Sequence, residues 1–179
     1  LNLPTVASMD LVENTHGSDT LTVHARDNGL IDLSGLTSAA CDETLRFLIE
    51  SGGNVDLTAL NATENVRFDV SVPSYSLPAL VQAEGTQLNV SAGSDVSLPA
   101  LTEHVGGGTD LQAGATVNAP ALQAFRDATF TAATGAGFNA PSLTDVRGST
   151  LNLEPGFGFT VGSLSNGDGA RFFVSGGLS

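Results

Sequence analysis

Apolar residues recur along this chain with a period of 21. Four prolines and two sets of apolar residues keep this step: Pro78, Pro99, Pro120 and Pro141; Leu80, Leu101, Leu122, Leu143 and Leu164; and Tyr75, Val96, Val117, Phe138 and Phe159. A constant period of this size is typical of solenoids, in which each repeat folds as one unit and buries its apolar side against its neighbours. The period therefore indicates a stack of similar coils.

Apolar and polar residues alternate inside each repeat. In 88–90 (LNV) and 96–98 (VSL) the outer residues are apolar and the middle one is polar, which is the pattern of a strand with one buried face. The following proline ends the second strand, because proline cannot donate to a strand ladder. A third short face follows, and its variable inward position holds Ala83, His104, Phe125 and Val146. A further apolar column has less regular steps, between 19 and 23 residues: Phe68, Leu88, Leu111, Phe130, Leu151 and Phe172.

These strands predict an all-β fold, a right-handed parallel β-helix (β-solenoid) with about eight coils of about 21 residues. Weaker copies at 1–6, 31–36 and 55–60 extend the pattern upstream. A leucine-rich-repeat-like solenoid is the alternative, with 55–63 as its strand and 38–51 as its helix. Most copies leave only about seven residues for such a helix, which is too short, so the β-helix is favoured.

Three places depart from the period. About seven extra residues lie between positions 6 and 21, about three lie between 36 and 47, and 106–108 is interpreted as a two-residue expansion. Insertions in solenoids map to the loops of one face, often the binding face. Tolerated loop drift gives the same pattern, so both interpretations stay open.

The second insertion predicts a short helix. Thr37 or Ser38 would cap it, and Leu45 and Phe47 would pack onto the core. Cys41 would then be a small apolar residue of the helix rather than a nucleophile.

Charge and hydropathy restrict the partners. The chain has 19 acidic residues, six arginines and no lysine, and its net charge is -13. Binding to nucleic acid through phosphates needs a basic face, so no nucleic-acid partner is predicted. No apolar run approaches the roughly 20 residues of a membrane span, so no membrane insertion is predicted. A single cysteine excludes an internal disulfide.

The whole chain, 1–179, is interpreted as a single repeat domain. Its first copy starts within the pattern and its last stops one strand into a new coil, so we expect a segment of a longer protein. An open coil end exposes unpaired strand edges and apolar side chains. End-to-end self-association is therefore another expectation.

Two arginines mark a candidate binding site. Arg126 and Arg147 lie one period apart, with Asp127 and Asp145 beside them and Asp168 at the next step. Arginine beside carboxylates in the groove of a β-helix is an arrangement that suits an acidic polysaccharide. Charges that neutralise each other on a turn would give the same pattern.

A polar column is the second candidate. One outward position reads Asp32, Asp56, Ser76, Ser97, Asn118, Asn139 and Thr160. Its amides, Asn118 and Asn139, would offer a flat hydrogen-bonding strip to a glycan. The alternative is a polar ladder that stabilises the stacking of the coils.

Calcium is the one cofactor that the sequence allows. The turns at 26–29, 93–95 and 166–169 are rich in Asp, Asn and Gly, and oxygen-rich turns can hold Ca²⁺. The same residues are favoured in turns for conformational reasons alone. No other cofactor is predicted.

The copies VDLTAL (55–60), VSLPALTEHVGGGTDL (96–111), VNAPALQAF (117–125) and FNAPSLTDVRGSTLNL (138–153) resemble the tandem repeats of large bacterial extracellular β-helix proteins. The resemblance implies a pectate-lyase-like architecture and an extracellular or cell-surface location, and it brings no catalytic residues. We therefore expect a non-catalytic structural or binding module that serves adhesion or contacts a polysaccharide or another surface protein. The alternative is a polysaccharide lyase or glycoside hydrolase on the same scaffold.

Overall fold

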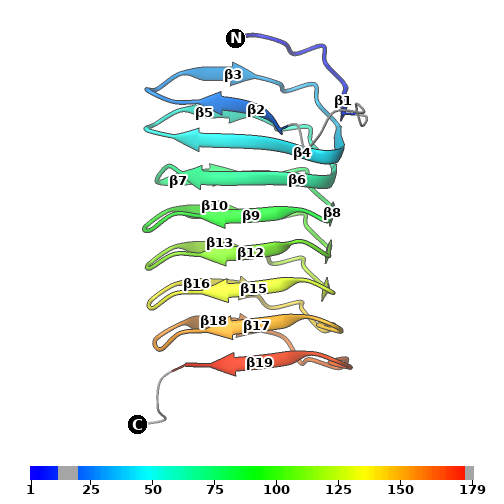
Figure 1. Cartoon of the computed structure of the whole chain (residues 1–179), viewed down its shortest axis with the longest axis vertical. Coiled ribbons are helices and arrows are strands. Elements are labelled where there is room, and N and C mark those ends of the chain that lie inside the picture. The colour runs from blue at the N-terminus through cyan, green and yellow to red at the C-terminus, as the bar shows by residue number, and fades with distance from the viewer. Residues whose placement is uncertain (12–19, 176–179) are drawn as a thin grey trace.

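The chain folds as a right-handed parallel β-solenoid of about seven turns of about 21 residues, which confirms the predicted fold class. The computed structural model describes residues 1–11 and 20–175. In Figure 1 the chain runs to the left along the near side, returns to the right along the far side, and descends towards the C-terminus. The described residues contain no helix. The leucine-rich-repeat alternative is therefore wrong, and the structure shows no helix that could span a membrane among these residues.

Three strand columns surround the core, and all their pairings are parallel. The long face consists of β2 (Thr20–Ala25), β4 (Ser38–Glu50), β6 (Ala62–Ser71), β9 (Gln87–Val90), β12 (Gly108–Leu111), β15 (Thr129–Ala132), β17 (Thr150–Leu153) and β19 (Arg171–Val174). The short face consists of β1 (Ser8–Leu11), the first halves of β4 and β6, β8 (Gln82–Glu84), β11 (Glu103–Val105) and β14 (Ala124–Arg126). The back face consists of β3 (Leu30–Asp32), β5 (Asn54–Asp56), β7 (Ser74–Ser76), β10 (Asp95–Ser97), β13 (Thr116–Asn118), β16 (Gly137–Ala140) and β18 (Gly158–Val161).

The core consists of the inward residues of all three faces. Phe47 of β4 stacks on Phe68 of β6 with their ring centroids 5.2 Å apart, and both are fully buried. Below them Phe130 is buried among four other phenylalanine rings: Phe125, Phe138, Phe157 and Phe159. Burying a side chain of this size stabilises the fold by roughly 1.5–3 kcal/mol. Stacking therefore supplies a large stabilising contribution in every turn.

The register corrects one predicted column. Thr109, not Leu111, lies between Leu88 and Phe130, and Leu111 pairs with Val90. With Thr109 in place every step from Leu88 onwards is 21, so 106–108 contains no insertion. The polar residue in an otherwise apolar column concealed this register in the sequence.

The predicted helix near residue 38 is a strand. In β4 the side chains of Ala39, Cys41, Leu45, Phe47 and Ile49 are buried, and β4 pairs with β6 at 38–40 and again at 45–50. The extra residues of this insertion form a bulge between Ala40 and Leu45, where the register shifts. Pairing on both sides and burial at alternate positions outweigh local helix propensity here.

The first expected copy, 1–6, adds no strand. Asn2 forms an isolated bridge with Asp32, and this end therefore contributes less than a full coil. This accounts for about seven turns where about eight were predicted. The insertion between 6 and 21 falls mainly on 12–19, outside the described residues.

The corner between the short and long faces repeats one unusual backbone conformation. Asn65, Gly85, Gly106, Asp127, Gly148 and Gly169 all have positive φ, between 51° and 67° for all but Gly169, at 71°. Asparagine and aspartate tolerate this left-handed region better than other side chains, and glycine adopts it freely. The corner is therefore restricted in sequence although it carries no core residue.

The back face is interrupted once. Strands β3 and β5 form a separate two-stranded sheet, and the five-stranded sheet begins at β7. Across the interruption the buried hydroxyl of Tyr75 donates a hydrogen bond of 2.8 Å to the Val55 carbonyl. The long face continues without a break at the same level, through β4 and β6.

The inward position of the short face holds a buried histidine. His104 pairs with Ala83 on one side and Phe125 on the other, and its ring centroid lies 4.8 Å from that of Phe125. The ring is buried, and its Nε2 has no hydrogen-bond partner among the described residues. Burial lowers the pKa of His104 to about 4, although hydrogen bonds to the backbone of Gly106 and Thr86 act against this.

Candidate functional site

The two predicted arginines each have a carboxylate of their own. Arg126 forms an ion pair with Glu103 of the neighbouring strand β11. Arg147 pairs with Asp145 at 2.8 Å, and its Nε also donates to both carboxylate oxygens. These hydrogen bonds lower the pKa of Asp145 and raise that of Arg147. Of the predicted charges, Arg147 and Asp145 are thus paired with each other, whereas Arg126 is paired with a carboxylate that the sequence did not indicate.

Asp127 takes a structural position beside them. It occupies the left-handed corner, with φ 51°, and its backbone N–H donates to the Arg147 carbonyl at 2.9 Å. A ligand-binding role for Arg126, Arg147, Asp127 and Asp145 stays a prediction.

The predicted polar column lies on the back face. Asn118 pairs in register with Ser97 on one side and Asn139 on the other. Asn139 Nδ2 donates to Asn118 Oδ1 at 2.7 Å. The two amides therefore bond to each other along the stack, and their binding of a glycan stays a prediction.

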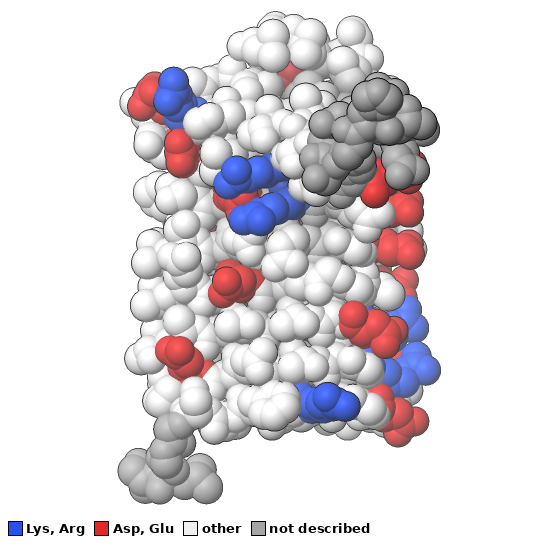
Figure 2. Space-filling model, viewed as in Figure 1, with Lys and Arg blue, Asp and Glu red and all other residues white. Residues whose placement is uncertain are grey.

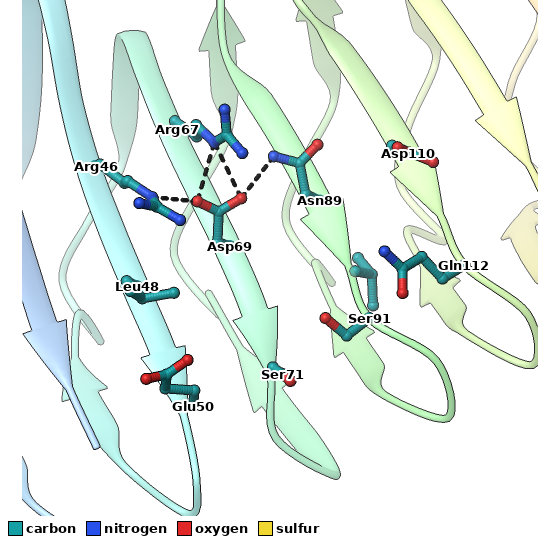
Figure 3. A pocket seen from close by; sticks show the side chains of 11 residues that line it. Arg46, Leu48, Glu50, Arg67, Asp69, Ser71, Asn89, Ser91, Asp110 and Gln112 are labelled. Carbon is teal, nitrogen blue, oxygen red and sulfur yellow. Dashed lines mark hydrogen bonds and ion pairs between the residues drawn. The ribbon is translucent and has the colours of Figure 1, made fainter.

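The long face carries a groove that the sequence analysis missed. It is an open hollow of about 330 Å³ across β4, β6, β9 and β12. Figure 3 shows the polar and charged side chains that line it, and Figure 2 shows the same charges as a blue and red group on a mostly uncharged face. The lining residues are Arg46, Leu48, Glu50, Arg67, Asp69, Ser71, Asn89, Val90, Ser91, Asp110 and Gln112.

Asp69 is the centre of this groove. Its carboxylate accepts hydrogen bonds from Nε of Arg46, from Nε of Arg67 at 2.9 and 3.0 Å, and from Nδ2 of Asn89 at 2.7 Å. The Asn89 Oδ1 in turn accepts a bond of 3.3 Å from Gln87 Nε2. The network joins three successive strands, β4, β6 and β9, and holds its planar groups in fixed positions (Figure 3).

The charge of Asp69 is maintained in a partly buried place. Burial by itself would raise the pKa of this carboxyl, since it disfavours the charged form. The hydrogen bonds from Asn89, Arg46 and Arg67 outweigh it, and the pKa lies below its ordinary value. Asp69 is therefore ionised at neutral pH and balances one of the two guanidinium charges.

The groove lies where the repeat is least regular. A second hollow adjoins it and shares Arg67 and Asn89, and its lining includes Thr44 from the bulged part of β4. The insertion predicted between 36 and 47 thus ends at the margin of the groove. This agrees with the general placement of solenoid insertions near binding faces.

A sequence signal for the groove existed. Arg46 and Arg67 are 21 residues apart, and Asp69 follows Arg67 by two positions, which places it on the same outward side of a strand. The signal was missed because the region around Arg46 was expected to be a helix.

The oxygen-rich turns show no assembled metal site. In the described part of the chain, no three His, Cys, Asp or Glu side chains are grouped so as to hold a metal ion. In the turn at 93–95, Asp95 accepts a hydrogen bond from the Thr116 hydroxyl of the next coil. Calcium binding stays a prediction.

Comparison of this chain with models of protein families, with characterised proteins and with solved structures found no significant match. The parallel β-solenoid of stacked coils therefore rests on the structure itself.

Proposed function

We propose that this chain is a non-catalytic binding module of a secreted or cell-surface bacterial protein, which contacts polysaccharide through its long face. The observation that carries the proposal is the groove around Asp69, where planar polar side chains are fixed at an open and otherwise weakly charged surface. Fold alone assigns no function, so the argument rests on this site.

Two physical features suit the groove to a polymer. Sites built on strands hold their side chains more rigidly than sites on loops, and the parallel stack repeats such positions along the rod. The groove is also open, so a chain-like ligand can enter and leave along its length. Amide, hydroxyl and guanidinium groups of the lining are suited to hydrogen bonds with sugar hydroxyls.

The exported location rests on the resemblance to bacterial extracellular β-helix repeats and on the acidic, lysine-free composition. Adhesion is the role that such a location and such a face would serve. High negative charge would keep a repetitive β-protein soluble and would oppose edge-to-edge pairing.

A glycan array with the purified chain, run with and without Ca²⁺, tests this function. We expect retention of polysaccharides, followed by no new reducing or unsaturated ends when a soluble form of each hit is incubated with the protein. Cleavage of a hit would instead favour the lyase or hydrolase alternative. Failure to retain any glycan would refute polysaccharide contact and leave a structural spacer as the better account.

A further inference from the structure

We propose that the ligand of the groove is an acidic polysaccharide, whose carboxylate or sulfate groups bind to Arg46 and Arg67. This inference rests on the proposed function and makes it more specific. It concerns a site that the predicted Arg126 and Arg147 do not share.

The charge balance of the cluster of Arg46, Arg67 and Asp69 differs from that of the other arginine pairs. Arg126 has Glu103 and Arg147 has Asp145, so each of these pairs is neutral. Arg46 and Arg67 share the single carboxylate of Asp69. The cluster of these three side chains therefore has one positive charge in excess, on a protein whose net charge is -13.

The other acidic side chains of the groove do not remove this excess from the cluster. Glu50 lies at the end of β4, four residues beyond Arg46, where its carboxylate accepts a hydrogen bond of 2.9 Å from His24 Nε2. Asp110 lies on β12, two strands away from Asp69 on β6. The centre of the groove is thus the place where a negative group finds a compensating charge.

Within the described part of the chain, the donors of both guanidinium groups are only partly used. The contacts with Asp69 are made through Nε of each arginine, and the terminal amino groups of both side chains take no part in them. Arg67 is 46% exposed and Arg46 is 34% exposed, whereas Asp69 is 13% exposed. A ligand therefore meets the terminal amino groups before it meets the carboxylate.

The two arginines are also placed side by side. Arg46 and Arg67 are register partners on neighbouring strands, and such strands lie about 4.8 Å apart. Guanidinium groups bind the oxygens of carboxylate and sulfate through paired N–H donors. The adjacent amide of Asn89 and the side chains of Ser91 and Gln112 would then face the sugar hydroxyls.

The test compares probes that differ in charge and variants that differ in site. Binding of alginate (carboxylates), dextran sulfate (sulfates) and dextran (uncharged) is measured by calorimetry in 0.15 M salt, where repulsion from distant acidic residues is largely screened. Arg67→Gln is the test variant. Arg26→Gln is its control, because Arg26 is 66% exposed, is also paired with a carboxylate, that of Asp27, and lies in neither candidate polysaccharide site.

We expect alginate or dextran sulfate to bind and dextran not to bind. Arg67→Gln should weaken that binding about tenfold or more, as loss of a charge-assisted contact does, and Arg26→Gln should change it less than about twofold. Asp69→Asn should strengthen it, because the competing carboxylate is lost while the shape remains. A variant that gains affinity cannot be explained by damage to the fold.

The possible outcomes distinguish a failure of this inference from a failure of the proposed function. Binding of dextran with the same affinity as the acidic probes would overturn the inference and leave polysaccharide contact intact. Equal affinity of Arg67→Gln and the unmodified chain would place the acidic ligand elsewhere and overturn the inference too. If none of the three probes binds and the glycan array is also empty, both fail together.

Discussion

Gly106 and Gly107 allow a sharp test of how rigidly the corner of the solenoid is stacked. The two residues are neighbours with almost equal backbone angles, φ 67° and φ 64°. A methyl group on Gly106 would meet the backbone of Gly85 at 3.5 Å, which is an ordinary contact. A methyl group on Gly107 would lie 2.7 Å from backbone carbonyl carbons of Gly85 and Thr86 and would overlap the Thr86 oxygen.

The expected magnitudes follow from these two environments. Either alanine would be held in the left-handed region, which destabilises a residue with a Cβ atom by about 1–2 kcal/mol. Gly106→Ala should therefore lower the free energy of unfolding by about that amount. Gly107→Ala adds an overlap with backbone that cannot rotate away, and overpacking of this kind adds about 1–3 kcal/mol. The free energy of unfolding of Gly107→Ala should therefore be lower than that of Gly106→Ala by about 1–3 kcal/mol.

Urea unfolding followed by far-ultraviolet circular dichroism measures both variants against the unmodified chain. Gly106→Ala is the matched control, since it carries the same added atom and the same backbone strain. Equal loss of stability in the two variants, within about 0.5 kcal/mol, would refute the reasoning. It would mean that the coil above moves aside at little cost, and that the spacing of the corner is not fixed.

Three further predictions concern the core. Phe130→Ala should destabilise the fold by about 3–5 kcal/mol in urea unfolding, because it removes a ring buried among other rings, whereas Phe173→Ala, at a residue 55% exposed, should change stability by less than about 1 kcal/mol. Burial favours the neutral form of His104, so its protonation at low pH should destabilise the fold. The contribution of the neutral ring to the free energy of unfolding is complete above the unfolded pKa of about 6.5 and is lost as the pH falls towards about 4. This loss amounts to about 3 kcal/mol. Urea midpoints at several pH values should show this slope, and its persistence unchanged in His104→Leu would contradict the assignment. Tyr75→Phe should cost about 1 kcal/mol, since the buried Val55 carbonyl loses its donor; an unaltered melting temperature would count against that bond.

The fold could be predicted from the sequence because the residues that recur once per turn are those whose side chains face the common core. Residues such as Val96, Val117 and Phe138 are spaced by one turn and pair in register. The same logic failed where a polar residue takes a core position. Thr109 is buried in a column of large apolar residues, and hydrophobicity alone assigned its place to Leu111.

The prediction also failed where local and long-range preferences compete. Residues 38–51 contain good helix formers, but their neighbours in the stack are strands, and a strand there gains partners on both sides. The groove was not predicted because of that error, since Arg46 lies in the segment expected to be a helix. The charge balance of the groove could not be predicted from the sequence either, because the register of β4 and β6 determines which carboxylate pairs with which arginine.

The interruption of the back face between β5 and β7 has a mechanical consequence. At that level the turns are joined by strand pairing on the long and short faces through β4 and β6, while the back is held by the hydroxyl of Tyr75. Bending that opens the back of the rod there would therefore break fewer backbone hydrogen bonds than bending between two paired back strands, and it would turn about the β4–β6 pairing. Arg46 and Arg67 lie on the two strands of that pairing, so a ligand that bridges them would oppose such bending.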